Sequence, residues 1–207
     1  MAHPQAPSLE LRGPDPHSSQ AMGARALWHG HSAPEGIAAQ AVGVVGPGDA
    51  ALAWVAARQC GVISYRQLLA CGLTADAVRH RRKTSRLHSL YRSVYLVGHR
   101  AAPEGGRQWA CVLACGAHAA LSLHSAGAWW SMSREKGDMV DVASTVNCGS
   151  KPGLRFHHTS EFGPRDLRSK RGLPVTSPAR TLIDLAGALS ERALERGRRG
   201  HPAAACP

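Results

Sequence analysis

Helix start and stop signals recur at short intervals between residues 49 and 98, and this spacing restricts the fold more than any other feature of the chain. Each of three short segments follows a residue that favours helix N-termini, and the first two end at a glycine. We therefore predict helices over residues 50–60, 65–71 and 75–84. Three short helices with tight, glycine-containing junctions are the expected outcome.

The second and third helices carry the clearest N-terminal signals. Ser64 and Gln67 have the spacing of a capping box, in which each side chain satisfies a backbone N–H group of the other residue. Thr74 is placed to cap the third helix, and Asp76 follows in its first turn, near the positive end of the helix dipole. The first helix has Asp49 as its N-cap candidate.

Two strands are expected directly after the third helix. Leu87–Leu90 and Val94–Val97 are rich in β-forming residues, and Tyr91-Arg92-Ser93 joins them as a hairpin. Gly98 closes the segment. Three helices followed by a hairpin are typical of a winged helix-turn-helix, which we place at residues 49–99 with the hairpin as its wing.

The charge of the chain points to a polyanionic partner. The formal net charge is +11, and residues 49–100 hold nine basic and two acidic side chains, the densest positive region of the chain. Charge alone does not separate nucleic acid from a membrane surface. The helical context of the charges has to decide between these partners.

The third predicted helix presents a cationic face. With Val78 turned to the core, Arg79, His80 and Lys83 lie on the opposite side, where a helix can enter the major groove of double-stranded DNA. A charge run is more often only a solvated helix face, but three capped helices and a hairpin favour DNA binding here. The candidate contact residues are Arg79, His80, Arg82, Lys83, Arg86 and Arg92.

The remaining chain divides into three parts. Residues 1–48 hold six prolines and seven glycines without sustained periodicity, so we expect a disordered extension. Residues 104–196 alternate between helix and strand patterns and predict a small α/β domain, which gives the whole chain an α+β fold class. Residues 197–207 are expected to form an irregular tail.

Within the second domain, helices are expected near residues 107–115 and 125–130 and strands near residues 139–143 and 154–158. Ser177-Pro178 is a strong start for a further helix up to Ala188, with Leu182, Ile183 and Leu185 turned inward. Ser190 is expected to cap a separate last helix.

The six cysteines do not have the spacing of a disulfide framework, which suits reduced thiols in a cytoplasmic protein. The set Cys111, Cys115, His118 and His124 matches no common zinc spacing, so we expect neither a metal site nor a cofactor. Asp138, Asp141, Asp166 and Asp184 occur without any recognised catalytic motif, and a surface salt bridge is the expected role of Asp141 and Asp184. We do not expect an enzyme.

The hydropathy pattern bears on membranes. No run of about twenty apolar residues occurs, so no membrane-spanning helix is expected. The first thirty residues have neither a basic start nor a continuous apolar stretch, which argues against a signal peptide.

Several stretches together resemble the AbiEi-type antitoxins of type IV toxin-antitoxin systems. The resemblance runs from about Ala50 to Arg196 and is most specific in RLHSLYRSVYLVGH and GLPVTSPARTLIDLA. It implies an N-terminal winged helix-turn-helix that binds operator DNA and represses its own promoter. It also implies a C-terminal antitoxin domain that counters a nucleotidyltransferase-like toxin.

The chain departs from the family pattern at several positions. Relatives commonly have glycine where this chain has Ser85 and Ser93, which predicts backbone strain at both, and Leu123 stands where histidine is usual. Many relatives continue into a nuclease-like domain related to very-short-patch-repair endonucleases. An alternative interpretation is therefore a truncated remnant of such a fused regulator, without catalytic activity.

Overall fold

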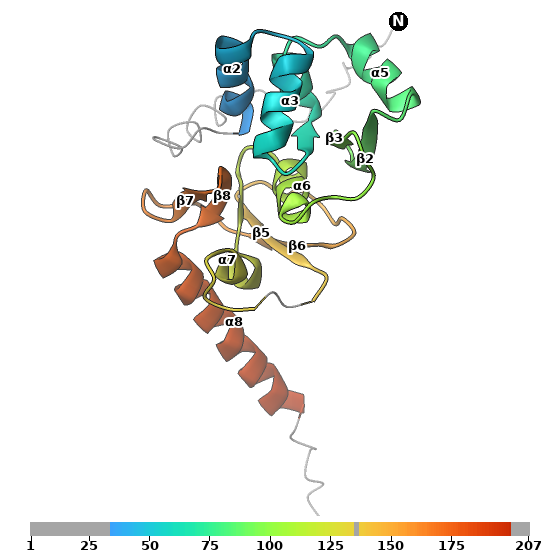
Figure 1. Ribbon diagram of the computed structural model, residues 1–207. Helices are drawn as coiled ribbons and strands as arrows, with labels where there is room; N and C mark the ends of the chain where they lie inside the picture. Colours follow the sequence, from blue (N-terminus) through green and yellow to red (C-terminus); the bar gives the residue numbers. More distant parts are fainter. Residues whose placement is uncertain (1–33, 135–136, 200–207) are drawn as a thin grey trace, which may run out of the picture.

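The computed structural model describes residues 34–134 and 137–199, with only the backbone path for residues 34–35 and 189–199. The described chain is an α+β protein with two separate β-sheets, as the sequence predicts (Figure 1). One sheet has three strands and the other has five. None of the described helices is both long and apolar enough to cross a membrane.

The three-stranded sheet lies with four helices in the N-terminal half of the described chain. The elements, in chain order, are α2 (Pro34–Val45), α3 (Asp49–Arg58), β1 (Val62–Ser64), α4 (Tyr65–Ala70), α5 (Ala75–Lys83), β2 (Leu87–Tyr91) and β3 (Val94–Val97). The strand order is β1-β3-β2, and both pairings are antiparallel. The helices and the hairpin predicted between residues 49 and 98 are confirmed, whereas β1 was not foreseen as a strand.

The predicted helix caps are present. The Ser64 hydroxyl accepts a hydrogen bond from the Gln67 backbone N–H at 3.3 Å, and the Gln67 side chain accepts one from the Ser64 N–H at 3.0 Å. The Thr74 hydroxyl accepts from the Ala77 N–H at 3.1 Å. Asp49 is not a cap, because α3 begins at this residue and Gly48 occupies the cap position. The local sequence therefore fixes where α4 and α5 begin.

The prediction of disorder is wrong for residues 34–45, which form α2. Ile37, Ala38 and Ala41 on this helix are buried in the core, and α2 packs against α3 and α4. Small alanine side chains at two of these positions let the helix approach its neighbours closely, which the composition of the segment did not reveal. Residues 1–33 of the predicted extension lie outside the described range.

The five-stranded sheet belongs to the second half. Its elements are α6 (Gly106–Cys115), β4 (Ala119–Leu121), α7 (Leu123–Trp129), β5 (Val140–Ser144), β6 (Leu154–His158), β7 (Leu167–Lys170), β8 (Leu173–Thr176) and α8 (Pro178–Arg199). The strand order is β6-β5-β4-β8-β7, with β5 parallel to β6 and β4 parallel to β8. The hairpin of β7 and β8 was not predicted, because β7 is short and polar and β8 contains Pro174, which disfavours a strand.

Helix α8 starts at Pro178 as predicted, but its orientation differs from the prediction. Leu182 and Ile183 are 57% and 68% exposed, and Leu185 is half-buried. The inward position is taken by Thr181, whose hydroxyl lies 2.8 Å from that of Thr176, so a polar anchor sets the rotation of the helix. The helix also runs without a break to Arg199, so the separate helix expected from Ser190 and the irregular tail expected from residue 197 are wrong up to that point. Residues 200–207 lie outside the described range.

One hydrophobic cluster extends through both sheets. Helix α6 contacts β1, β2 and β3 on one side and β4 and β5 on the other, and Figure 1 shows it between the two sheets. Its residues Trp109, Cys111 and Val112 are almost fully buried in this cluster. Because α6 belongs to the core of both sheets, it fixes how the first half of the chain sits on the second.

Candidate nucleic-acid interface

The outward face of α5 is cationic. Val78 is 2% exposed and anchors the helix on the core, as predicted, while Arg79, His80 and Lys83 on the other side are exposed. Asp76 lies 2.5 Å from a guanidinium nitrogen of Arg79, but both side chains are largely exposed and such a pair contributes little to stability. The Arg79 side chain is therefore free to exchange this partner for another anion.

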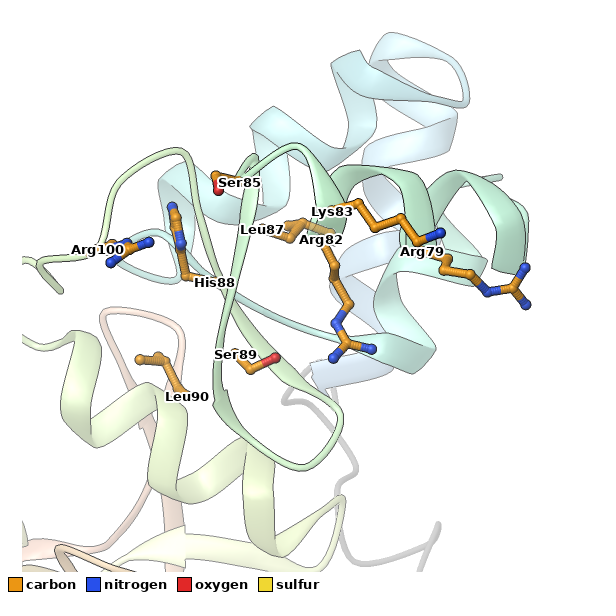
Figure 2. A pocket seen from close by; sticks show the side chains of 9 residues that line it. All are labelled: Arg79, Arg82, Lys83, Ser85, Leu87, His88, Ser89, Leu90 and Arg100. Atoms are coloured by element: carbon orange, nitrogen blue, oxygen red, sulfur yellow. The ribbon is translucent and has the colours of Figure 1, made fainter.

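A basic groove with a volume of about 640 Å³ lies between the C-terminal part of α5 and strand β2. Figure 2 shows Arg79, Arg82 and Lys83 on the helix side and His88 and Arg100 on the hairpin side. Each charged side chain that the described structure places on the groove is basic. The groove is therefore suited to an extended anion such as a phosphodiester backbone.

The groove brings together three of the six predicted contact residues, Arg79, Arg82 and Lys83. The other three do not line it. His80 and Arg86 are exposed beside it, and Arg92 lies in the hairpin turn, at the opposite end of β2 from Leu87. Sequence periodicity placed these residues on the right elements but could not give the position of the hairpin relative to α5.

Two other arginines of α5 have partners that hold the helix in place. Arg81 is 19% exposed at its side chain and lies 2.7 Å from Asp49 at the start of α3. The guanidinium of Arg82 stands over the Tyr95 ring at 5.7 Å from the ring centre. Arg81 thus ties α5 to α3, while Arg82 leans across the hairpin and forms part of the wall of the groove.

Arg100 was not among the predicted site residues. It follows Gly98, where the predicted wing ends, so neither strand alternation nor helix periodicity assigned it to a surface. What places Arg100 at the groove is the antiparallel register of the hairpin. Leu87 pairs with Val97, and the Gly98 N–H donates to the Arg86 carbonyl at 3.0 Å. This pairing returns the chain after β3 to the end of α5.

The two strained positions that the sequence indicates have positive φ angles. Ser85 has φ 56° and Ser93 has φ 63°, both in the left-handed region that favours glycine. Ser85 ends α5, where its N–H donates to Arg82 and the next N–H, of Arg86, donates to the Arg81 carbonyl at 2.8 Å. Ser93 lies in the hairpin turn, and its carbonyl accepts from the Tyr65 N–H at 2.8 Å.

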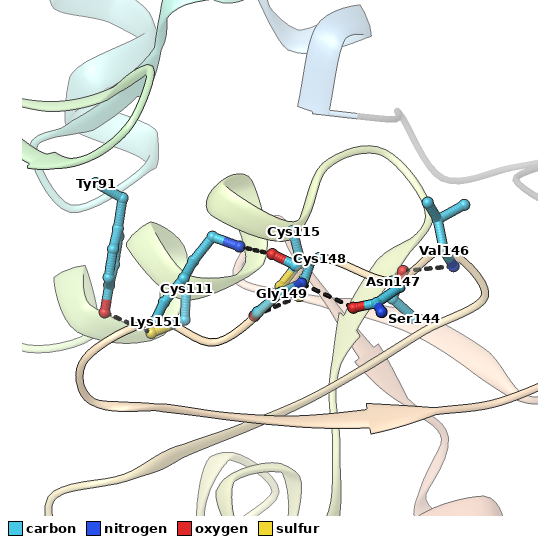
Figure 3. The surroundings of a disulfide bond; sticks show 9 residues. All are labelled: Tyr91, Cys111, Cys115, Ser144, Val146, Asn147, Cys148, Gly149 and Lys151. Atoms are coloured by element: carbon cyan, nitrogen blue, oxygen red, sulfur yellow. Dashed lines mark hydrogen bonds between the residues drawn. A yellow bond between two sulfur atoms is a disulfide. The ribbon is translucent and has the colours of Figure 1, made fainter. Parts of the chain in front are cut away.

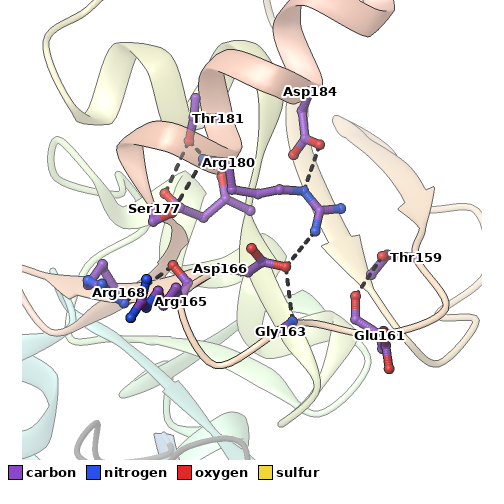
Figure 4. A network of polar contacts seen from close by, with 11 residues as sticks. Thr159, Glu161, Gly163, Arg165, Asp166, Arg168, Ser177, Arg180, Thr181 and Asp184 are labelled. Atoms are coloured by element: carbon purple, nitrogen blue, oxygen red, sulfur yellow. Dashed lines mark hydrogen bonds and ion pairs between the residues drawn. The ribbon is translucent and has the colours of Figure 1, made fainter.

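A second cleft, of about 580 Å³, lies beside α8 in the other half of the molecule. Arg180 lies on it and bonds to Asp184 at 2.8 Å and Asp166 at 2.7 Å, as Figure 4 shows. The hydrogen bond to Asp184 is the main reason that the pKa of Arg180 is raised. The predicted pairing of Asp184 is thus confirmed, and the charges on this cleft satisfy one another.

Asp141 does not form the surface salt bridge that was expected. It is 2% exposed on β5, and its carboxylate lies 2.9 Å from His157 Nε2 and 3.2 Å from an Arg155 nitrogen, both on the neighbouring strand β6. The parallel register of β5 and β6 creates this buried contact. It is a structural link between the strands.

The prediction that all the cysteines are reduced thiols is wrong for two of them. Cys115 and Cys148 form a disulfide, whereas Cys60, Cys71 and Cys111 are free thiols. The two joined residues are far apart in the sequence, so their spacing gave no signal. In the described part of the chain, no group of three or more His, Cys, Asp or Glu side chains is placed to hold a metal ion.

Comparison with known proteins adds no assignment. No protein-family model matches the chain, and no curated protein is significantly similar to it. The resemblance to the AbiEi-type antitoxins therefore stays a prediction from the sequence.

Proposed function

We propose that this chain is a regulator that binds double-stranded DNA through α5 and the β2–β3 hairpin. In this proposal α4 and α5 are the helix-turn-helix pair, and the hairpin is the wing. The observation that carries the proposal is the groove between α5 and β2, whose charged side chains are all basic. Lys83 on α5 and Arg100 on the segment after β3 both line it, as expected of a site that binds a phosphate backbone.

The outward face of α5 supplies the means to read a sequence. Arg79 is 65% exposed at its side chain and held only by an exposed carboxylate, so it can turn to a guanine edge in the major groove. Lys83 and Arg82 lie one turn further along, where they can hold the flanking phosphates. The proposed role requires no catalytic step and no cofactor.

The first test uses fluorescence anisotropy at moderate salt to measure binding of the chain to DNA from the region upstream of its own coding sequence. Replacing Arg79 and Lys83 together by alanine is expected to weaken binding at least about tenfold, near the lower end of what one good base contact supplies. Arg100→Ala is expected to lower the salt dependence of binding by about one released counterion.

Arg165→Ala is the matched control, because it removes an exposed arginine on the loop before β7, away from the groove. This variant should bind nearly as well as the unchanged protein. Equal affinity of the Arg79/Lys83 double variant and the unchanged protein would refute α5 as the DNA-contacting helix.

The second part of the proposal is an antitoxin role in the cytoplasm, and it is supported only by the resemblance to the AbiEi-type family. The chain would repress its own promoter and counter a nucleotidyltransferase-like toxin made from the same operon. Co-expression with a neighbouring gene product of that class should restore growth that the toxin alone arrests. Growth arrest that persists in the presence of the chain would remove the antitoxin role and leave the DNA-binding role standing.

A further inference from the structure

The disulfide joins the end of α6 to the segment between β5 and β6, and both lie near the predicted wing. Cys115 is the last residue of α6, and Cys148 lies on the segment between β5 and β6, with the two Cα atoms 4.9 Å apart. Figure 3 shows that this segment is also held by local contacts, since Lys151 Nζ donates to the Cys148 carbonyl and the Gly149 N–H donates to the Asn147 side chain. The disulfide thus attaches this segment to the C-terminal end of α6 at Cys148.

The wing is anchored on that same segment. Tyr91, the last residue of β2, donates its hydroxyl to the Pro152 carbonyl at 2.8 Å. The same hydroxyl lies 3.4 Å from Cys111 Sγ, as Figure 3 shows. Pro152 follows Cys148 closely in the sequence and lies in a turn that the Leu154 N–H closes by donating to the Lys151 carbonyl at 3.2 Å. The acceptor of Tyr91 is therefore held from the disulfide on one side and from the start of β6 on the other. A chain of contacts therefore leads from the Cys115–Cys148 bond to the hairpin that forms one wall of the groove.

Cys111 lies nearby but is not suited to react itself. It is 1% exposed, and burial raises the pKa of its thiol, which keeps it protonated and weakly nucleophilic. Cys115 and Cys148 are half-buried and therefore more accessible to a thiol from solution.

We propose that the Cys115–Cys148 disulfide is a redox-controlled clasp that fixes the wing through Tyr91 and so sets the affinity of the chain for DNA. A dithiol reductant opens the clasp in two exchanges. Its first thiolate attacks one sulfur of the bond and forms a mixed disulfide, and its second thiolate resolves this intermediate. The products are two protein thiols and the oxidised cyclic form of the reductant.

Opening the clasp frees the Cys148 side of the segment that carries Pro152, while the turn before β6 keeps its backbone hydrogen bonds. The Pro152 carbonyl that accepts from Tyr91 is then held from one side only, and strand β2, which provides His88 and Ser89 to the groove, becomes more mobile. Because the mobile wing must then become ordered when DNA binds, the affinity for DNA is lower. The DNA part of this inference rests on the proposed function, whereas the effect on the hairpin does not.

The test compares the full chain in its oxidised form and after treatment with dithiothreitol, in a Cys206→Ser background that removes the cysteine outside the described residues. Hydrogen exchange of the amides of residues 87–97 and the Kd for DNA are measured for both forms, and thiol alkylation records the state of the disulfide. Reduction is expected to accelerate exchange in the hairpin and to raise the Kd about fivefold, the effect of losing one net hydrogen bond.

Two variants separate the clasp from a general loss of structure. Tyr91→Phe should keep the disulfide but show no difference between the oxidised and reduced forms, because the link to Pro152 is absent in both. Cys60→Ser, which changes a free thiol, should respond to reduction like the unchanged protein. Cys148→Ser should match the reduced form under all conditions. If it does not fold, reduction followed by reoxidation of the unchanged chain makes the same comparison.

The outcomes are distinct. The clasp is refuted if hydrogen exchange in the hairpin is identical in the oxidised and reduced forms. It is also refuted if DNA binds with the same affinity in both forms. A redox response that persists in Tyr91→Phe also overturns it. If the hairpin responds while neither form binds any DNA, the structural clasp stands and the proposed DNA-binding function fails.

Discussion

At the scale of single residues, one strained backbone position, Ser85, lies on the groove itself. Ser85 occupies the position after α5 at which many helices place glycine, and both hydrogen bonds of a Schellman motif form around it. Gly72 holds the equivalent position after α4 with φ 89°, and Ser131 holds it after α7 with φ 63°. The chain thus uses the same helix ending with and without glycine, and only the serine versions carry a conformational cost.

Replacing Ser85 by glycine is expected to raise the free energy of unfolding by about 1 kcal/mol, because glycine adopts a positive φ without a Cβ clash. Chemical denaturation measures the change. Ser85→Ala is the control, since it removes the hydroxyl but keeps the Cβ, and it should give no gain. A gain of the same size in both variants would show that the hydroxyl, and not the backbone angle, is unfavourable.

At the scale of elements, the sequence predicts best where a signal is local. The capping residues Ser64 and Thr74 place α4 and α5 correctly, because a cap depends only on residues within one turn. The rotation of α8 was missed because it depends on Thr181 meeting Thr176 from another element. Helix α2 was missed for a related reason, since its stability comes from packing on α3 and α4 and not from its own composition.

The burial of α2 is tested by two substitutions on the same helix. Ile37 is 7% exposed and Val44 is 64% exposed, so Ile37→Ala should lower the free energy of unfolding by roughly 2–4 kcal/mol. Val44→Ala should change it by less than about 0.5 kcal/mol. Denaturant titrations followed by circular dichroism provide both values. Similar small effects at the two positions would mean that α2 is not docked on the core in solution.

At the scale of the whole molecule, the candidate site could be predicted only in part. Helix periodicity indicated the cationic face of α5, including Arg79 and Lys83, because the face of a helix follows from its sequence. The groove and the contribution of Arg100 depend on where the hairpin folds back. The disulfide depends on the meeting of α6 with the segment after β5, and no single-sequence pattern encodes such a distant contact.

The position of α6 between the sheets predicts that they lose structure together. Val112 is fully buried in the shared cluster, so Val112→Ala should lower the free energy of unfolding by roughly 2 kcal/mol. Hydrogen exchange should then accelerate by a similar factor in β3 of one sheet and β8 of the other. Val146→Ala, at a position 52% exposed, is the control and should leave both rates unchanged. Acceleration in only one sheet would show that the two halves unfold independently.

The strand order of the larger sheet has a consequence for how the chain folds during its synthesis on the ribosome. Strand β4 lies at the centre of this sheet, yet Leu121 finds its parallel partner Val175 only at the far end of the described sheet region. Such a contact closes a long loop and forms slowly. During synthesis the helices and hairpin of the first half emerge long before β8 does. The nascent chain must therefore keep one edge of β4 open until nearly the whole second half has left the exit tunnel.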